Sequence, residues 1–276
     1  MSVVEEMTRD SSAATPPASA ASQKARVELA GVRILALKLV LPALLLATWM
    51  AASVLAPSMA TVLPSPVAVL WALWEKMASG ELAGHVGASL GRAVVGFFIA
   101  AAIGIALGLV MSQSRLLREL LSGPVELLRP ISSIAWIPLA ILWFGIGFKS
   151  VVFVIVISCI FIIVLNTLAA AGNVDRDLIK SALTLGANRR QLFTKVVLPS
   201  AVPGIMLGLR IAMTGAWGGV LIAEMIATSQ GLGYMIVRAQ ASYQPEVVIG
   251  GMVVVGIVGY LLNMLFVLAQ RRITHE

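Results

Sequence analysis

The chain has 276 residues and a mass of 29.0 kDa; 59% of its residues are hydrophobic and 12% are charged, whereas soluble proteins average roughly 45–50% and 25%. A soluble protein of this size needs more charged side chains on its surface than this chain contains. The composition therefore excludes an ordinary soluble domain and indicates an integral membrane protein. The net charge of +7 is spread between long apolar runs instead of gathered on one face, which argues against nucleic acid as a partner.

Residues 1–34 are polar and rich in Ala, Ser and Pro, which predicts a flexible cytoplasmic tail. Residues 35–272 contain apolar stretches of about 20 residues, the length that a helix needs to cross a bilayer. We therefore predict an all-α membrane protein whose transmembrane domain covers 35–272. Its six transmembrane helices are expected at about 36–56, 93–111, 131–148, 151–170, 201–226 and 247–269.

The distribution of Lys and Arg predicts the orientation, because these residues accumulate in short cytoplasmic loops. With the N-terminus in the cytoplasm, the cations that fall clearly outside are only Lys76, Lys149 and Arg238. Arg92 and Arg210 lie at span edges, and most of the others are cytoplasmic, including Arg115, Arg118 and Arg129 between the second and third spans. Both termini are therefore predicted to be cytoplasmic.

Two of the predicted loops are long. The outer loop, 57–92, contains a helix-like stretch in which Trp71 and Trp74 share one face. That face suits the bilayer interface and packing on the bundle equally well. The inner loop, 171–200, is the one long cytoplasmic segment between predicted spans, so it is the expected place for a soluble partner to dock.

The inner loop reads as a helix, a turn and a second helix. Asp177 is placed to cap the first helix, and Gly186 permits the positive φ that ends it. Asn188 is placed to cap the second helix, which we expect to run until Pro199. The small apolar face of Ala182, Leu183, Leu185 and Leu192 suits insertion into a groove on another protein.

This loop resembles the cytoplasmic "EAA" loop of the permease subunits of ABC importers. Gly186, the nine residues 187–195, and then Val196, Leu198 and Pro199 fit that pattern in register. At its start, Lys180 and Ser181 stand where the family has Glu and Ala, and Ala182 matches. Further blocks resemble the permeases of nitrate, sulfonate and taurine importers: 63–66, 79–82, 89–92, 129–130, 137–147 and 231–234.

The resemblance implies a type I ABC importer permease (MetI-like architecture), a multi-pass subunit of the bacterial inner (plasma) membrane that forms a homodimer in contact with lipid. It implies two kinds of partner, a pair of cytoplasmic ATP-binding subunits and a periplasmic substrate-binding protein. Such a permease moves a small anion, such as a sulfonate, taurine or nitrate, into the cytoplasm by alternating access. The residues implied to form the ATPase-docking coupling helix are Ala182, Leu183, Thr184, Leu185, Gly186, Ala187, Asn188, Arg189 and Arg190.

The sequence predicts no ATP site in this chain. The segment 145–150 comes nearest to a phosphate-binding loop, but Phe148 stands where that motif needs a Gly before Lys149. The lone Cys159 and the two distant histidines, His85 and His275, have no metal-ligand spacing. We therefore expect no catalytic residue, metal or cofactor here, with ATP and Mg bound to the partner ATPase.

Candidates for the translocation pathway or its gate are Trp136, Pro138, Asn166, Trp217 and Glu224. Glu224 is the one acid inside a predicted span, and ionisable residues within a membrane are usually functional. It could instead reach interfacial water or pair with an Arg of the bundle. For the other four, packing, a helix kink or hydrogen bonding between helices are the alternatives.

Two pairs of glycines have the Gly-x-x-x-Gly spacing that lets transmembrane helices approach closely. They are Gly104 with Gly108, and Gly215 with Gly219. We predict that both pairs lie at helix–helix contacts.

Two other functions are compatible with a membrane bundle. An ion-coupled secondary carrier of a small anion would need several buried charges and inverted halves, and no repeat relates the first three spans to the last three. A structural or signalling protein would use 175–199 to recruit a cytoplasmic partner without transport. The importer permease is the preferred interpretation.

Overall fold

The structure is a computed structural model that describes residues 40–55 and 62–274. The chain divides into two compact units, 1–57 and 58–276. The described part of the first unit is the apolar helix Val40–Leu55. The predicted tail 1–34 and both ends of the predicted span 36–56 lie outside the described residues.

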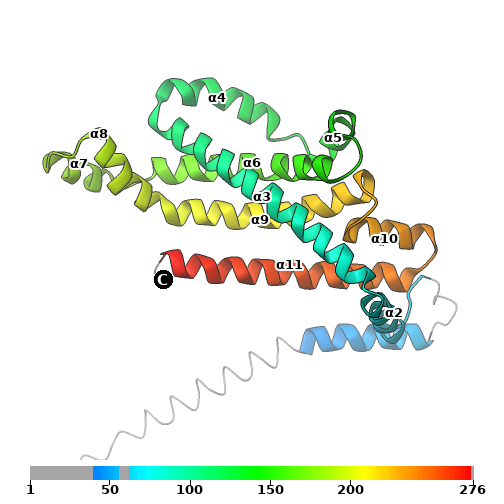
Figure 1. Cartoon of the computed structure of the whole chain (residues 1–276). Coiled ribbons are helices and arrows are strands. Elements are labelled where there is room, and N and C mark those ends of the chain that lie inside the picture. Colours follow the sequence, from blue (N-terminus) through cyan, green and yellow to red (C-terminus); the bar gives the residue numbers. More distant parts are fainter. Residues whose placement is uncertain (1–39, 56–61, 275–276) are drawn as a thin grey trace, which may run out of the picture. The chain divides into compact units, whose positions relative to one another are not determined.

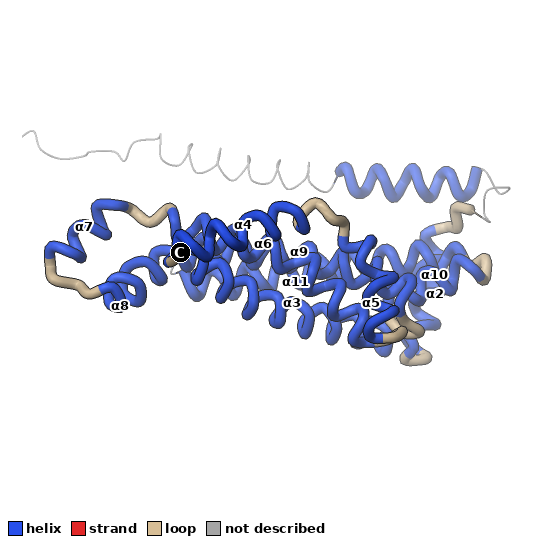
Figure 2. Tube along the Cα trace, turned by 90° about the horizontal axis from the view of Figure 1, so that it is seen from above, coloured by secondary structure: helices blue, strands red, loops and turns tan. Residues whose placement is uncertain are grey.

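The described part of the second unit is built from helices without strands (Figures 1 and 2). In chain order they are α2 (Pro66–Ala78), α3 (Glu81–Gln113), α4 (Arg115–Leu128), η2 (Ser133–Trp136), α5 (Ile137–Phe144), α6 (Phe148–Gly172), α7 (Arg176–Thr184), α8 (Arg189–Leu192), η3 (Phe193–Val197), α9 (Leu198–Ala227), α10 (Leu232–Ala241) and α11 (Pro245–Thr274).

The helix α6 is the centre of the core, and α3 and α9 pack along it (Figure 1). Glycines of α3 allow this helix to approach α6 closely. A Cβ on Gly96 would lie 2.7 Å from Ile155, and one on Gly108 would lie 2.6 Å from Thr167. These distances are shorter than van der Waals contact, so the two backbones approach as closely as they do only because α3 has glycine there.

Glycines also allow α9 to pack closely against α6. A Cβ on Gly208 would lie 2.5 Å from Asn166, and one on Gly219 would lie 2.9 Å from the Ser158 hydroxyl oxygen. The predicted close approach at Gly104, Gly108 and Gly219 is therefore confirmed, with a Gly104 Cβ 2.8 Å from Ile163. Gly215 makes only ordinary contact.

A second layer is formed by α11, which packs on α9, α10 and α2. Trp217 of α9 holds α11 in place: its indole N–H donates to the Val255 carbonyl at 3.1 Å, and its ring lies against Gly259. The ends of the bundle differ: α7 and α8 lie at one end with the C-terminus, and α2 and α10 lie at the other (Figures 1 and 2).

Four of the described helices are long and apolar enough to cross a membrane: α3, α6, α11 and the run from α8 through α9. A fifth crossing is possible if α4 and the pair η2–α5 count as one span, bent by 91°. The helix Val40–Leu55 is apolar but shorter. The all-α membrane fold is thus confirmed, whereas the count of six spans is not.

The predicted third span, 131–148, is not one continuous helix in the structure. Residues 133–136 form a 3-10 turn, α5 covers only Ile137–Phe144, and Gly145 and Gly147 follow with φ of 73° and 140°. The prolines at 130 and 138 lack a backbone N–H, and the two glycines permit positive φ, so the segment folds into short pieces. Pro138, the predicted place of a break or kink, lies in the first turn of α5.

Arg129 does not lie beside Arg115 and Arg118 at the end of α3, as a short loop between the second and third spans would place it. The helix α4 carries the chain back from the end of α3 nearest α7 over a length of about 21 Å, at 1.5 Å for each of its 14 residues (Figure 1). Arg129 then lines a recess with Ser158, from the middle of α6, and Gly215, from the middle of α9. It therefore lies at mid-span depth.

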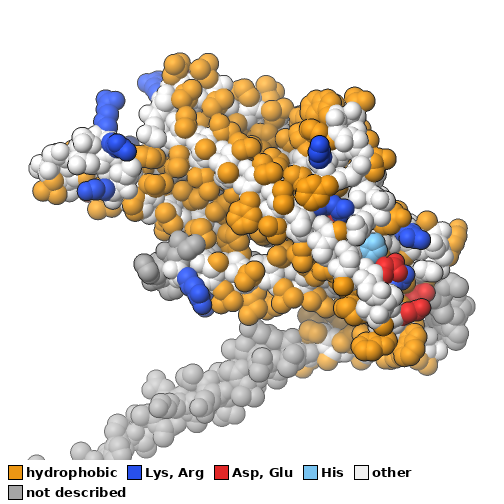
Figure 3. All heavy atoms as spheres, viewed as in Figure 1, with side chains coloured by type: hydrophobic (Ala, Val, Ile, Leu, Met, Phe, Trp, Pro, Cys, Tyr) orange, Lys and Arg blue, Asp and Glu red, His pale blue; other side chains and the backbone are white. Residues whose placement is uncertain are grey.

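The surface of the bundle differs between its length and its two ends (Figure 3). Hydrophobic side chains cover its length, and most of the charged side chains in this view gather at the α7–α8 end and at the α2–α10 end. An apolar band between two charged ends is the distribution expected for a protein that crosses a bilayer.

Candidate functional site

The helices α7 and α8 and the turn between them form a projection at one end of the bundle, called here the coupling projection (residues 175–192) (Figure 2). The Asp175 side chain accepts the Asp177 N–H at 2.8 Å and caps α7. After Leu185, Gly186 has φ of 82°, and the N–H of Ala187 donates to the Ala182 carbonyl at 3.0 Å. The turn is thus closed by its own backbone and needs glycine at 186.

The second half of the projection begins with a reciprocal cap. The Asn188 side chain accepts the Gln191 N–H at 2.8 Å, and the Gln191 side chain accepts the Asn188 N–H at 2.9 Å. This capping box satisfies two N–H groups that the start of α8 would otherwise leave free. The predicted cap at Asn188 and turn at Gly186 are confirmed.

Three details of the predicted loop are corrected. Asp175 caps α7 in place of Asp177, and the segment 182–190 is the end of α7, a turn and the start of α8, so it is not one helix. The second helix does not end at Pro199 but continues as α9. It does so through the π-turn η3, in which the Leu198 N–H bonds to the Phe193 carbonyl, because Pro199 has no N–H and occupies the first turn of α9.

The projection exposes apolar side chains that have no core to fill. Leu185 is 88% exposed, Leu178 and Leu183 are each 52% exposed, and no residue of α7 or α8 is buried. Lys180 is 3.3 Å from the Asp177 carboxylate, whereas Arg189 and Arg190 form no ion pair with a described residue. An exposed apolar tip beside unpaired cations has the composition of a docking surface.

At the opposite end, a buried polar cluster ties α3, α9 and α10 together; it is called here the outer clasp (His85, Ser89, Arg92, Glu224 and 228–233). Glu224 is 0% exposed. Its carboxylate accepts from the Arg92 guanidinium at 2.5 Å, from the Ser89 hydroxyl at 2.7 Å and from the Gly233 N–H at 3.1 Å. A buried carboxylate is tolerable only with such complete pairing.

The outer clasp also caps the start of α10. The Leu232 N–H donates to the Ser89 hydroxyl at 2.9 Å, and the Gly231 N–H donates to His85 Nδ1 at 3.0 Å. Arg92 donates to the Gln230 carbonyl at 2.6 Å, which fixes the turn before the helix. The side chains of α3 and α9 thus satisfy the free N–H groups of a third helix.

Comparison with known proteins identifies the chain. Residues 100–275 match the model of the family "binding-protein-dependent transport system inner membrane component". The chain belongs to this family. It is 35% identical over 235 residues to the putative aliphatic sulfonates transport permease SsuC of Bacillus subtilis, covering 85% of each chain. It is 34% identical over 237 residues to the taurine transport system permease TauC of Escherichia coli, covering 84% of this chain and 86% of TauC.

The fold agrees. An inward-facing structure of the methionine ABC transporter MetNI matches 72% of this chain and 99% of the compared chain with a TM-score of 0.64, at 23% identity. The MetI-like, all-α architecture is therefore confirmed. This ABC transporter permease is the channel component of a transport system, and membership of the family favours that role over a stand-alone secondary carrier.

The structure does not gather the five predicted pathway residues of the permease into one site. Glu224 is in the outer clasp, Trp217 is buried between α9 and α11, and Asn166 donates to the Ile162 carbonyl of its own helix at 2.8 Å beneath Gly208. Trp136 packs on Phe153, and Pro138 is exposed in the first turn of α5. Of the alternatives, pairing with Arg92 describes Glu224, and packing describes Trp217.

Two cations of the permease lie deeper in the bundle than the predicted spans place them. Arg92 was assigned to a span edge, yet it is 6% exposed inside the continuous α3. The signal was present: His85, Ser89 and Arg92 are spaced by four and three residues, so they lie on one helical face. Arg129 was treated as a marker of topology, and its place in the recess beside α6 and α9 depends on the bend after α4.

Proposed function

We propose that this permease is the transmembrane, channel-forming subunit of an ATP-driven importer that moves a small anion, such as a sulfonate, taurine or nitrate, into the cytoplasm by alternating access. The observation that carries the proposal is the coupling projection. Its apolar tip at Leu185 and its cations at Arg189 and Arg190 lie beyond the bundle, in a family whose members work with other subunits. The energy source is a separate pair of ATP-binding subunits that hold ATP and Mg.

The backbone gives the coupling projection the rigidity of a lever. The turn at Gly186 is closed by hydrogen bonds, and α8 runs through η3 into α9 without a loop. A displacement of the projection is therefore transmitted along α9 to its close contact with α6. Transmission of this kind needs a stiff element that adopts two discrete positions, which a continuous helix provides.

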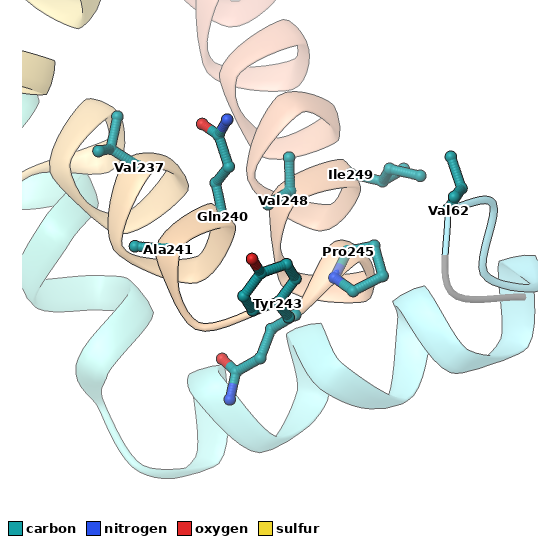
Figure 4. Close-up of a pocket in the computed structure, with 9 residues that line it drawn as sticks. Val62, Val237, Gln240, Ala241, Tyr243, Pro245, Val248 and Ile249 are labelled. Carbon is teal, nitrogen blue, oxygen red and sulfur yellow. The ribbon is translucent and has the colours of Figure 1, made fainter.

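The opposite end of the bundle is the proposed contact for a periplasmic substrate-binding protein. Tyr243, in the turn between α10 and α11, is 94% exposed and has φ of 54° (Figure 4). It borders a recess of about 670 Å³ with Gln240, Pro245 and Val248. An aromatic side chain held outward beside a recess is typical of the residues that dominate protein interfaces.

This arrangement sets the proposed orientation and assembly. The coupling projection is cytoplasmic, and the C-terminus of α11 lies at the same end of the bundle (Figure 1). The predicted cytoplasmic N-terminus agrees with an even number of crossings. Two copies form the channel as a homodimer in the bacterial inner membrane, so each ATP-binding subunit engages one projection.

The proposal is tested by Gly186→Trp in the full chain, expressed with its ATP-binding subunit. We expect this variant to lose most of the co-purified ATPase, because Trp both strains a positive φ and covers the apolar tip. The matched control is Gly80→Trp. Gly80 has φ of 76° and, like Gly186, no atom within 4 Å of an added Cβ, but it lies at the junction of α2 and α3 at the other end.

Two results would count against the proposal. Retention of the ATPase by Gly186→Trp at the level of Gly80→Trp would show that docking occurs elsewhere. Uptake of anions by liposomes that contain this chain alone, driven by an ion gradient, would indicate the secondary carrier. The expected result is uptake only with the ATP-binding subunits, the binding protein and ATP present.

A further inference from the structure

A recess opens at mid-span depth on the face of the bundle formed by the end of α4, α6 and α9. Its volume is about 460 Å³, within the range of pockets that hold small organic molecules. Arg129, Pro130, Ser132 and Ser133 border it from the bend after α4. Residues near the middle of α6 and of α9 form its other walls.

The recess carries an uncompensated positive charge. Arg129 forms no ion pair with a described residue, and no acidic side chain is among the residues that line the recess. This differs from Arg92, a buried cation of α3 whose guanidinium donates to the Glu224 carboxylate and to the Gln230 carbonyl. A guanidinium at membrane depth needs a partner, and an anion supplies one.

Three serine hydroxyls line the same recess as Arg129. Neither the Ser132 nor the Ser133 side chain forms a hydrogen bond with a described group: Ser132 precedes the turn η2 without capping it. The Ser158 hydroxyl donates to the Val154 carbonyl at 2.8 Å, so its remaining lone pair accepts but its proton is used. Two free hydroxyl donors and a guanidinium match the several oxygens of a sulfonate or carboxylate group.

The rest of the wall is apolar. Ile157, Phe161, Ile162 and Ile222 line it, and a Cβ added at Gly218 would meet nothing within 4 Å, so that glycine leaves space free. An inorganic anion such as nitrate has no part that would contact these side chains. An anion with an alkyl or aryl substituent places its charge at Arg129 and its apolar part along α6 and α9.

We propose that this recess is a substrate contact of the translocation pathway, in which Arg129 binds the acidic group of an organic sulfonate or carboxylate and the isoleucines and Phe161 contact its apolar substituent. The inference rests on the proposed import function and narrows its substrate class from small anions to organic ones. Ser132 and Ser133 donate to the oxygens that the guanidinium leaves free.

The test measures the charge of the recess without an ATPase. Ser132→Cys in the full chain, reconstituted in nanodiscs, is reacted with anionic 2-sulfonatoethyl methanethiosulfonate or with its cationic trimethylammonioethyl counterpart. The thiolate forms a disulfide with the reagent, and methanesulfinate leaves. The native Cys159 is 0% exposed, so the unmodified chain supplies the background.

We expect the ratio of anionic to cationic labelling rates at Ser132→Cys to fall by at least about tenfold when Arg129→Gln is added, since the cation among the residues that line the recess is removed. Arg129→Lys keeps the charge and retains most of the ratio. Arg115→Gln, at the start of α4 with its side chain 92% exposed, is the matched control and leaves the ratio unchanged. Labelling of Ser181→Cys on α7 is insensitive to Arg129→Gln.

Protection then tests the substrate class. Hexanesulfonate and benzoate are expected to slow labelling of Ser132→Cys, and nitrate at the same concentration is not. An unchanged labelling ratio in Arg129→Gln, or equal protection by nitrate, would overturn the inference. Neither result depends on ATP, so the proposed function is tested separately: a shifted ratio with no ATP-driven uptake by the whole complex keeps the anion site but removes the importer.

Discussion

The outer clasp and the coupling projection lie at opposite ends of the bundle and are stabilised in opposite ways. In the outer clasp, Glu224 is 0% exposed and accepts three hydrogen bonds from the helices α3 and α10. In the coupling projection, no residue of α7 or α8 is buried, and order comes from local caps at Asp175 and Asn188. The outer clasp pairs its Glu224 carboxylate within this chain, whereas the coupling projection leaves its apolar side chains exposed.

The difference predicts how each region responds to substitution. Groups of the outer clasp are separated by more than 130 residues in the chain and make one another's burial possible, so each substitution there is felt by the whole fold. Side chains of the projection contact few others within the chain, so substitutions there alter function while the fold persists. Four predictions test this contrast, in order of decreasing effect.

The largest effect is expected in the outer clasp. Arg92→Ala leaves the Glu224 carboxylate buried without its cation, which costs about 3–5 kcal/mol. The full chain in detergent should then unfold at a markedly lower temperature or fail to accumulate. The double variant Arg92→Leu, Glu224→Leu should be less destabilised than Arg92→Ala, because no unpaired charge remains.

The exposed pair of Arg115 and Glu119 supplies the control. It is also an Arg–carboxylate contact, at 2.8 Å, but its side chains are 92% and 63% exposed. Glu119→Ala should leave the unfolding temperature almost unchanged. An equal loss of stability in Arg92→Ala and Glu119→Ala would contradict the assignment of the clasp as a buried, interdependent cluster.

The second effect concerns the contact of α3 with α6. Gly108→Ala places a Cβ 2.6 Å from Thr167, so we expect a loss of about 1–3 kcal/mol in the free energy of unfolding. Gly91→Ala, on the same helix, adds a Cβ with nothing within 4 Å and should stabilise slightly through helix propensity. Thermal unfolding of the two variants side by side decides the matter, and equal transitions would mean that α3 and α6 pack less closely.

The sequence revealed local features and missed those that depend on distant contacts. The Gly186 turn, the Asn188 cap and the Gly104–Gly108 contact follow from residue type and spacing, and all three are present. The predicted second span starts after Arg92, because a charged residue usually marks the edge of a span. Arg92 is nevertheless buried, and its pairing with Glu224, which is distant in the chain, makes that burial possible. The bend after α4 likewise depends on packing.

The third effect is confined to the coupling projection. Asn188→Ala removes one half of the capping box, with a local cost of about 1 kcal/mol to α8. We expect faster amide hydrogen exchange in 189–192 and weaker stimulation of the ATPase, with no change in the unfolding temperature of the bundle. The control is Thr194→Ala, which loses only a side-chain bond to the Arg190 carbonyl. A lower unfolding temperature for Asn188→Ala would mean that the projection is part of the core.

The smallest effect on the fold is expected at Lys180, where the resemblance to ABC importer permeases places Glu. Lys180→Glu removes a 3.3 Å contact with Asp177 on an exposed face and places two acids three residues apart on α7. The stability of the chain should therefore hardly change. If the partner's groove carries an acid opposite Lys180, affinity for the ATP-binding subunit should fall at low salt, and the deficit should shrink with added salt because salt screens the repulsion. Lys180→Gln distinguishes loss of attraction from added repulsion, because it should lie between the two. Equal affinity of all three forms would mean that the apolar tip at Leu185 alone determines docking.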